Sequence, residues 1–317
     1  MTRYEGHAFG KVILLGEHAV VYGRPALAVG ISPGASATFE PAAGEPSSIA
    51  LDISTWNLHV LQTDTTDLAR ALAALAAHLA ERFTSARATS GRVDATIHLP
   101  AGGGLGSSAA LGVAIARAVG TAWRDDAMST DDVLGAALVW ERVFHGNPSG
   151  VDHTVATVGG AGTFTRADGL ARIPLRAPLR ILLADTAERS STRTMVEGVA
   201  RIHARRPEAT DRTFDAIETL VHDGARSLRA GDALSLGRAM DLNQALLSSL
   251  LLSTERTEEL CRIAREAGAF GAKLTGGGGG GCVIALASRE GEDRVLDAWR
   301  AAGAPTFAAE VTPTEHP

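Results

Sequence analysis

The residues best suited to chemistry form a glycine-rich loop from Ala101 to Ala110, which reads Ala-Gly-Gly-Gly-Leu-Gly-Ser-Ser-Ala-Ala. Its four glycines let the backbone approach a polyanion and turn N–H groups toward it, and the N-terminus of a following helix adds partial positive charge. Ser107 and Ser108 lie in the first turn of that helix, where a hydroxyl can reach a metal on the phosphates. The loop therefore predicts a phosphate-binding site.

The same loop fits two other interpretations. Gly104-x-Gly106-x-x-Ala109 satisfies the dinucleotide-binding pattern, and Asp125 or Asp126 follows at a tolerable distance for an acid that binds ribose. A plain glycine-rich turn between strand and helix also has this composition. The loop alone leaves three interpretations open: a phosphate-binding loop, a dinucleotide-binding loop and a structural turn.

A second glycine tract runs from Gly276 to Gly281, between Lys273-Leu-Thr and Cys282. Each ordered glycine costs more backbone entropy than alanine, so a tract that leads directly into a buried strand favours either a flexible linker or a backbone held against a ligand. Linkers usually bring serine and polar residues, which are absent here. The tract therefore favours approach to a ligand.

Charged residues flank a short apolar segment near the N-terminus. Residues 12–15 predict a buried strand that ends at Gly16, with Lys11 at its start and Glu17 and His18 at its exit. Binding and catalytic side chains often lie at the ends of strands. The alternative is a surface lysine and a solvated Glu-His pair, since such residues are usually exposed.

Two further carboxylates come from a predicted helix and the turn after it. The helix has Ser129 or Thr130 as N-cap and should end near Gly146, so Glu141 falls in its last turns, where the helix dipole disfavours an acid unless a cation compensates it. The turn then delivers Asp152. The alternative for each is a capping or surface acid.

A zinc site is not expected. His145 and His153 lack helix-face zinc spacing, and Glu17-His18 lacks the H-E-x-x-H frame.

These four motifs, in this order, resemble those of the GHMP kinase family. Residues 16–23 and 145–152 look like the versions found in the members that phosphorylate mevalonate, and residues 273–276 resemble the third family motif. The motifs cover about a fifth of the residues, but their order extends the resemblance over nearly the whole chain. Two small departures are Gly277, where the family commonly has alanine, and His153, where asparagine is common.

The resemblance implies a role for each motif. Asp152 would be the base that takes the proton from the substrate hydroxyl, and Lys11 would lower the pKa of that hydroxyl. Ser108 and Glu141 would bind Mg²⁺. The implied ATP-binding residues are Gly102, Gly103, Gly104, Leu105, Gly106, Ser107, Ser108, Gly276, Gly277 and Gly278, and the implied substrate-binding residues are Glu17, His18, Thr192 and Arg193.

These roles agree with what phosphoryl transfer needs, which is alignment and charge neutralisation by backbone donors, a metal, a cation and a carboxylate. A P-loop kinase would need G-x-x-x-x-G-K-[ST], whereas Gly10-Lys11 is followed by valine. The V-A-I-K, H-R-D and D-F-G signatures of protein kinases do not occur. A nucleotide-sensing pseudoenzyme would not need Glu141 and Asp152 together.

Composition sets consistent limits. With 317 residues, 45% of them hydrophobic, the chain can form two domains with proper cores. A net charge of −6 argues against a nucleic-acid partner, and no apolar run predicts a membrane span or signal peptide. Two cysteines are too few for a disulfide framework. We therefore expect a cytoplasmic protein.

Hydrophobic periodicity predicts the elements that position these motifs. A strand over residues 93–99 precedes the loop, and a helix follows from Ser107. Two prolines and three arginines in residues 172–180 indicate a domain boundary, so we expect domains of residues 1–176 and 177–317. Further predictions are a helical leucine stripe over residues 68–79, broken strands over 35–61, a strand at 181–184, helices to about 268, a strand at 282–287, a helix ending near 303 and a strand at 306–311.

This alternation predicts an α+β fold. The resemblance adds a ribosomal protein S5 domain 2-like N-terminal domain and a ferredoxin-like C-terminal domain. It implies ATP- and Mg²⁺-dependent phosphorylation of the C5 hydroxyl of mevalonate for isoprenoid synthesis, with mevalonate and ATP as partners and a homodimer left open. Another GHMP kinase, acting on phosphomevalonate or a sugar, is the nearest alternative. An NAD-dependent dehydrogenase is the alternative from another class.

Overall fold

The computed structural model of the protein describes residues 2–42, 48–83, 90–124, 126–146 and 148–311. The chain divides into two compact units, which are described separately. The first contains residues 1–11, 33–99 and 106–159, and the second contains residues 12–32, 100–105 and 160–317. Strands β1 and β2 contribute residues to both units. The domain boundary predicted after residue 176 stays a prediction, because such units need not coincide with family domains.

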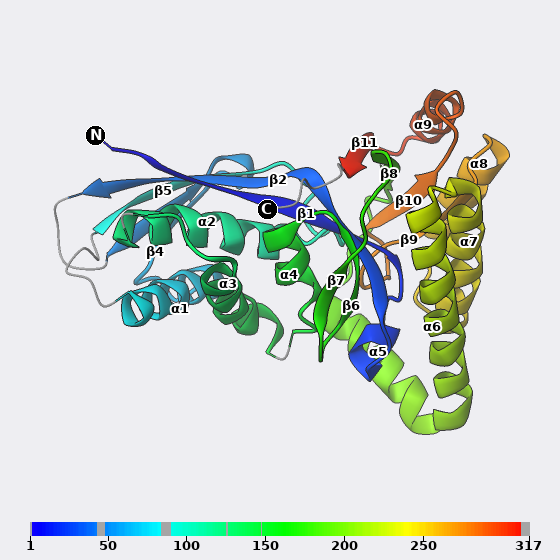
Figure 1. Cartoon of the computed structure of the whole chain (residues 1–317), viewed down its shortest axis with the longest axis horizontal. Helices are drawn as coiled ribbons and strands as arrows, with labels where there is room; N and C mark the ends of the chain where they lie inside the picture. The colour runs from blue at the N-terminus through cyan, green and yellow to red at the C-terminus, as the bar shows by residue number, and fades with distance from the viewer. Residues whose placement is uncertain (1, 43–47, 84–89, 125, 147, 312–317) are drawn as a thin grey trace. The chain divides into compact units, whose positions relative to one another are not determined.

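The first unit is built on a sheet in the order β4-β3-β5-β2, with β1 paired to β2. Strands β2 and β5 are antiparallel, with Ala35 opposite Ile97, whereas β3 and β5 are parallel. Figure 1 shows the helices of this unit on one face of the sheet. Its strands are β1 (Tyr4–Leu15), β2 (Ala26–Ala42), β3 (Ile49–Ile53), β4 (Leu58–Leu61) and β5 (Ser90–Ile97), with a short 3-10 helix at Ser54–Trp56.

Helices α1 and α3 of the first unit each begin after a residue whose hydroxyl caps the N-terminus. Thr66 accepts a hydrogen bond from the Ala69 amide, and Ser129 accepts one from the Asp132 amide at 3.2 Å. Each hydroxyl satisfies one N–H of the first helical turn, which otherwise has no intrahelical acceptor. The helices are α1 (Asp67–Arg82), α2 (Ser107–Arg124), α3 (Thr130–His145) and α4 (Val151–Val158).

The second unit has strands in the order β2-β11-β8-β10-β9, with β6 paired to β2 and β7. Strand β10 is antiparallel to both β8 and β9, so the glycine tract connects β9 to β10 as a hairpin loop. It is not an interdomain linker. The strands are β6 (Ala161–Thr165), β7 (Gly169–Arg172), β8 (Leu179–Asp185), β9 (Gly271–Leu274), β10 (Cys282–Leu286) and β11 (Thr306–Val311), and the 3-10 helix η1 spans Ala19–Tyr22.

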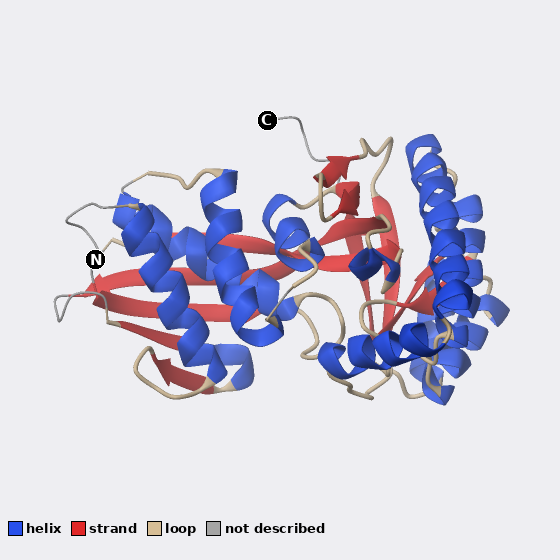
Figure 2. Cartoon of the chain, turned by 90° about the horizontal axis from the view of Figure 1, so that it is seen from below, coloured by secondary structure: helices blue, strands red, loops and turns tan. Residues whose placement is uncertain are grey.

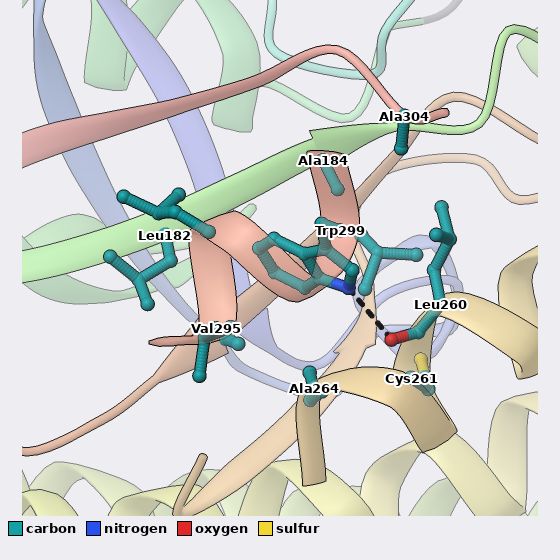
Figure 3. Packing of buried hydrophobic residues seen from close by; sticks show 12 residues of the cluster. Leu182, Ala184, Leu260, Cys261, Ala264, Val295, Trp299 and Ala304 are labelled. Atoms are coloured by element: carbon teal, nitrogen blue, oxygen red, sulfur yellow. Dashed lines mark hydrogen bonds between the residues drawn. The ribbon is translucent and has the colours of Figure 1, made fainter. Parts of the chain in front are cut away.

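Helices pack on these strands around a core centred on Trp299. Its indole is fully buried against Leu182, Ala184 and Ala264, and its Nε1 donates to the Leu260 carbonyl at 2.8 Å (Figure 3). The long helices α6 and α7 lie side by side (Figure 1 and Figure 2). The helices of this unit are α5 (Thr192–Arg205), α6 (Pro207–Ala230), α7 (Ala233–Ser249), α8 (Glu255–Glu266) and α9 (Glu292–Ala301).

The mixture of helices and strands confirms the α+β prediction. One predicted element is wrong in extent: β1 begins at Tyr4, so Lys11 lies inside the strand rather than at its start. The first half of β1 gives no apolar signal because its buried positions include Gly6 and Ala8. A Cβ on Gly6 would come within 2.1 Å of the Ala114 carbonyl of α2, so only glycine fits there.

None of the helices in the described residues combines the length and the hydropathy that a membrane span needs.

Candidate active site

Strand β1 and helix α4 bring Lys11 and Asp152 together in the first unit. The Lys11 Nζ lies 2.8 Å from Asp152 Oδ1, and the two side chains are 4% and 36% exposed. Gly106 adjoins the pair, because a Cβ there would lie 3.3 Å from Lys11 Cβ and 3.6 Å from Asp152 Oδ1. The structure therefore places the predicted base, the predicted lysine and one glycine of the phosphate loop side by side.

The charge of Lys11 determines the protonation of Asp152. Burial by itself would raise the pKa of this carboxyl, but the adjacent ammonium and its hydrogen bond lower the pKa below the ordinary value of 3.8. Asp152 is thus a carboxylate at neutral pH. Its exposed fraction leaves it accessible to a proton donor from solution.

Helices α2 and α3 bring a second pair together. Ser108 Oγ, in the first turn of α2, donates to Glu141 Oε1 at 2.9 Å, and Glu141 lies in the penultimate turn of α3. The Trp140 indole donates to the Ser108 carbonyl at 3.1 Å and packs on Gly112, where a Cβ would lie 2.6 Å from the ring. This packing fixes the spacing between the helices, and so between hydroxyl and carboxylate.

Glu141 is a strongly perturbed acid. Burial raises its pKa from an ordinary 4.5 to about 7, the negative charge of Asp152 adds to the rise, and the Ser108 hydrogen bond and Lys11 oppose it. His145 Nε2 lies 3.5 Å from Glu141 Oε2. A buried carboxylate whose charge is this poorly compensated is a favourable ligand for a cation.

The oxygen donors of Ser108 and Glu141 fit Mg²⁺, which proteins bind through one or two oxygen ligands while phosphates and water complete the shell. Among the described residues, no group of three or more His, Cys, Asp or Glu side chains could hold a metal without such help. Ser108, rather than Ser107, is the serine whose hydroxyl contacts Glu141.

In the second unit the two glycine segments pack against each other. The Cys282 amide donates to the Gly103 carbonyl at 3.0 Å. A Cβ on Gly104 would lie 2.6 Å from the Thr275 carbonyl, and one on Gly276 would lie 2.9 Å from the Gly104 carbonyl. Side chains at either position would separate the segments, which explains in steric terms why both are rich in glycine.

The predicted phosphate loop runs through both units along the chain. Residues 102–105 belong to the second unit, and residues 106–108 continue into the first, at the N-terminus of α2. Gly102, Gly104 and Gly106 adopt positive φ angles of 66°, 78° and 72°. Only glycine adopts these φ angles at low energetic cost. The segment precedes a helix N-terminus whose first N–H groups lack intrahelical acceptors.

Glu17 and His18 are buried, at 1% and 5% exposed, so the alternative of a solvated surface pair is wrong. Lys273 of β9 forms an ion pair with Glu17 Oε1, and both side chains are 0% exposed. Asn243 of α7 donates to Glu17 Oε2 at 3.1 Å. Both oxygens of Glu17 are therefore bound inside the protein.

His18 stands at a positive φ of 61°, which is unusual for a residue with a side chain. Its Nε2 lies 2.8 Å from the Gly277 carbonyl, and its buried Nδ1 has no hydrogen-bond partner among the described residues. Burial lowers the pKa of His18, and the bond to Gly277 opposes that shift. A neutral imidazole with one unsatisfied nitrogen can bind a polar substrate group.

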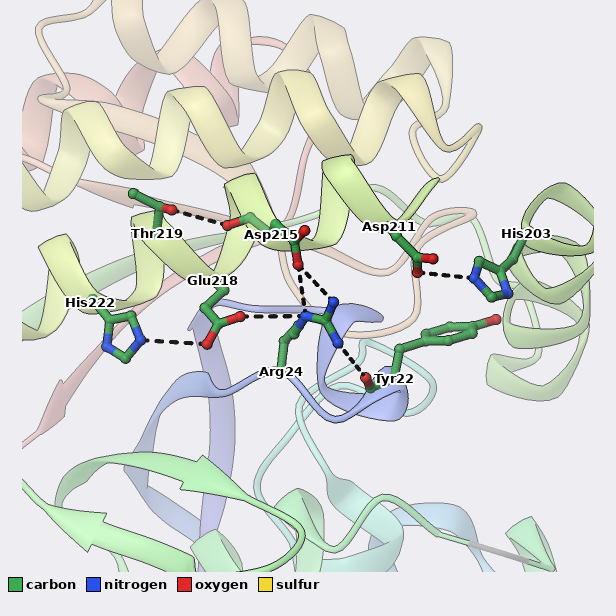
Figure 4. A network of polar contacts seen from close by, with 8 residues as sticks. All are labelled: Tyr22, Arg24, His203, Asp211, Asp215, Glu218, Thr219 and His222. Carbon is green, nitrogen blue, oxygen red and sulfur yellow. Dashed lines mark hydrogen bonds and ion pairs between the residues drawn. The ribbon is translucent and has the colours of Figure 1, made fainter. Parts of the chain in front are cut away.

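The η1 turn after His18 and the residues that follow it contact helix α6. Arg24 Nη2 contacts Asp215 Oδ1 at 2.7 Å, and its Nε lies 3.4 Å from Glu218 Oε2 (Figure 4). The Tyr22 ring stacks on Phe214 with centroids 4.5 Å apart. These contacts hold the segment that carries His18.

Thr192 and Arg193 begin helix α5, whose N-cap Ser191 accepts from the Thr194 amide at 3.0 Å. Both are exposed. A Cβ on Gly277 would lie 3.2 Å from Thr192 Oγ1, so Thr192 and His18 flank the same glycine. The structure thus brings three predicted residues of the second unit together.

Sequence reasoning assigned no role to Lys273, Asn243 or Arg189. Lys273 lies in the segment that resembles the third family motif, but its partner Glu17 lies 256 positions away. Asn243 and Arg189 belong to no recognisable motif.

Two acids, Asp125 and Asp126, were considered for ribose binding. Asp125 lies outside the described residues. Asp126 is exposed after α2 and accepts from the Ala127 amide at 2.8 Å.

Comparison with known proteins gives a consistent result. Two family models match: the GHMP kinases N terminal domain over residues 66–160, and GHMP kinases C terminal over residues 225–305. A mevalonate kinase of Aeropyrum pernix is 35% identical over 309 residues, covering 95% of this chain and 94% of that protein. A mevalonate kinase of Pyrococcus abyssi is 34% identical over 294 residues, covering 87% and 86%. The structure of L. major mevalonate kinase in complex with R-mevalonate superposes with a TM-score of 0.82 at 26% identity, covering 100% of this chain and 97% of that chain.

Proposed function

We infer, since this chain belongs to the GHMP kinase family and within it to the mevalonate kinases, that it transfers the γ-phosphoryl group of ATP to the C5 hydroxyl of mevalonate, giving 5-phosphomevalonate and ADP. The identity to mevalonate kinases over most of both chains carries this conclusion. The expected two-domain GHMP kinase fold is confirmed by the same matches. The dehydrogenase alternative loses its support.

We propose that Asp152 accepts the proton of the C5 hydroxyl as that oxygen attacks phosphorus. Lys11, 2.8 Å from Asp152, keeps the base deprotonated and lowers the pKa of an adjacent hydroxyl by placing a buried positive charge beside it. The same ammonium stabilises negative charge on the attacking oxygen.

Residues 102–108 would hold the ATP phosphates through backbone N–H groups and the N-terminus of α2. Gly276, Gly277 and Gly278 are the predicted contribution of the glycine tract. Ser108 and Glu141 would hold Mg²⁺, which neutralises phosphate charge when bound. The charge state of Glu141 then affects how well that metal is held, because its pKa of about 7 is close to neutral pH.

His18, Thr192 and Arg193 are the proposed substrate contacts, with the Arg193 guanidinium as the donor to the mevalonate carboxylate. The neutral His18 imidazole donates through Nε2 to the Gly277 carbonyl, so its Nδ1 would accept a hydrogen bond from a substrate hydroxyl. Glu17 acts differently in this proposal. With both oxygens bound by Lys273 and Asn243, it positions the turn that carries His18 instead of contacting the substrate. The cytoplasmic location and a homodimer stay predictions.

The experiment is a panel assay of the purified protein with ATP, Mg²⁺ and one acceptor at a time, with ADP release as the readout. We expect mevalonate to be the best acceptor and galactose and homoserine to be poorer by at least about 10³ in kcat/KM, because a site that pairs with specific polar groups rejects compounds lacking them. Phosphomevalonate should give no ADP, since its C5 oxygen already carries the phosphoryl group. Fastest turnover with phosphomevalonate or a sugar would overturn the mevalonate assignment.

A further inference from the structure

Arg189 lies in the connection between β8 and α5, outside every motif that the sequence suggested. Its guanidinium binds the Asp185 carboxylate in a bidentate pair, with Nη1 to Oδ1 and Nη2 to Oδ2 both at 2.7 Å. Its Nε donates to the Ala101 carbonyl at 2.8 Å. Ala101 is the first residue of the glycine-rich loop, so this side chain joins β8 to the loop.

The same connection binds the glycine tract. The Thr186 amide and hydroxyl donate to the Gly281 carbonyl at 2.9 and 2.8 Å, and the Gly281 amide donates to the Glu188 carbonyl at 2.9 Å. Both glycine segments are therefore anchored to residues 185–189. Glycine has high backbone entropy, so external anchors of this kind are needed to hold one conformation.

The anchor is itself rigid. Asp185 is 8% exposed, pairs in register with Cys282 of β10, and accepts from the Ala187 amide at 2.8 Å. The aliphatic part of Arg189 covers Gly102, where a Cβ would lie 2.9 Å from Arg189 Cδ. A bidentate arginine pair fixes orientation as well as distance.

We propose that Asp185 and Arg189 form a clasp that holds residues 101–104 in the conformation that binds the phosphates of ATP. Four hydrogen bonds to Asp185, Ala101 and Glu188 occupy the guanidinium, so Arg189 is a positioning residue that acts through the loop. The proposal rests on the phosphate-binding role proposed above for residues 102–108.

The test compares Arg189→Ala, Arg189→Lys and Asp185→Asn in steady-state kinetics with MgATP and mevalonate. Arg189→Ala should raise the KM for ATP about tenfold and leave the KM for mevalonate within about twofold, because it removes charge-assisted bonds to the loop. Arg189→Lys should still raise the KM for ATP about fivefold, because an ammonium keeps the charge but lacks the planar fork.

Asp185→Asn separates the clasp from simple charge attraction. Removing a negative charge would strengthen ATP binding if long-range electrostatics governed it. The clasp predicts the opposite, a rise of about threefold or more in the KM for ATP, because the bidentate pair is lost. A lower KM for ATP in this variant, or full rescue by Arg189→Lys, would overturn the proposal.

Arg180→Ala is the matched control. Arg180 lies near the start of β8, at the other end of the strand from Asp185, and forms surface ion pairs at 2.7 Å to Glu292 and 3.8 Å to Glu310. It should leave both KM values unchanged. All variants are compared by thermal unfolding, and an equal loss of kcat and of affinity for both substrates would indicate general damage and refute a positioning role.

Calorimetric binding of a non-hydrolysable ATP analogue with Mg²⁺ makes the two proposals separable. If the wild-type protein binds the analogue but does not phosphorylate mevalonate, the proposed function fails while the clasp is still tested by the variants. Analogue affinity that is equal in the wild type and in Arg189→Ala would refute the clasp.

Discussion

Asp152 shows how one neighbour can set the chemistry of a residue. Without Lys11, burial would raise the pKa of this carboxyl. With the ammonium 2.8 Å away, the pKa falls below its ordinary value. Such a carboxylate is a weak base toward a free alcohol. It becomes effective as the hydroxyl oxygen bonds to phosphorus and its proton becomes acidic.

Replacing Asp152 by asparagine tests this role. Asp152→Asn keeps the size of the side chain but cannot accept the proton, so we expect kcat to fall by about 10² to 10⁴. ATP affinity should stay within about threefold, because proton transfer is not needed for nucleotide binding. Initial-rate kinetics and analogue binding measure the two effects.

Asp131→Asn is the matched control, since Asp131 is an exposed aspartate in the first turn of α3. It should retain the wild-type kcat. A near-wild-type kcat in Asp152→Asn would show that another group takes the proton.

The sequence predicted the residues of this site better than their surroundings. Lys11, Ser108, Glu141 and Asp152 all lie in motifs, and the structure brings them together in pairs. Arg189 and Asn243 could not be found in this way, because their partners Ala101 and Glu17 lie 88 and 226 positions away. Such contacts depend on tertiary structure, which local patterns do not encode.

At the scale of elements, caps predicted helix starts, and apolar runs predicted the strands β8, β10 and β11 to within two residues at each end. Ser129 predicts the start of α3, and β11 matches the predicted residues 306–311. Strand β9 was missed because its four residues, Gly271–Leu274, include a lysine and yet are all buried. Its charge is compensated by Glu17, a partner that the local sequence cannot supply.

The Glu17–Lys273 pair connects β9 to the turn after β1, so its loss should weaken the fold of that element. Lys273→Met leaves a fully buried carboxylate with an amide donor from Asn243, and we expect the free energy of unfolding to drop by about 3–5 kcal/mol. The double variant Glu17→Gln/Lys273→Met should be less destabilised than the sum of the two single variants. Urea unfolding measures these values.

Arg262→Met provides the control, because Arg262 forms an exposed ion pair with Glu266 at 2.6 Å on α8 of the same unit. An exposed pair of this kind contributes at most about 1 kcal/mol. Equal effects of Arg262→Met and Lys273→Met would contradict the importance given to burial.

At the scale of the whole molecule, the acidic composition requires positive charge to be local wherever anionic substrates bind. The chain carries a net charge of −6, and both ATP and mevalonate are anions. Buried Lys11 and the loop amides supply that charge in the proposed mechanism, and Glu141 opposes it until a cation is bound. Without a bound cation, the buried charge of Glu141 therefore lowers the stability of the folded protein.

The free energy of unfolding should report this cost as a dependence on pH. The pKa of Glu141 is about 7 in the folded protein against an ordinary 4.5, so between these pH values the folded state binds more protons than the unfolded state. The contribution of Glu141 to the free energy of unfolding is fully present below pH 4.5. It is lost as pH rises toward 7, by about 3 kcal/mol in total. The side chain of the Glu141→Gln variant stays neutral. Without Mg²⁺, the free energy of unfolding of this variant relative to the wild type should therefore increase as pH rises across this range. Urea unfolding at pH 5, 6, 7 and 8 measures the difference, and parallel pH profiles for the two proteins would contradict the raised pKa.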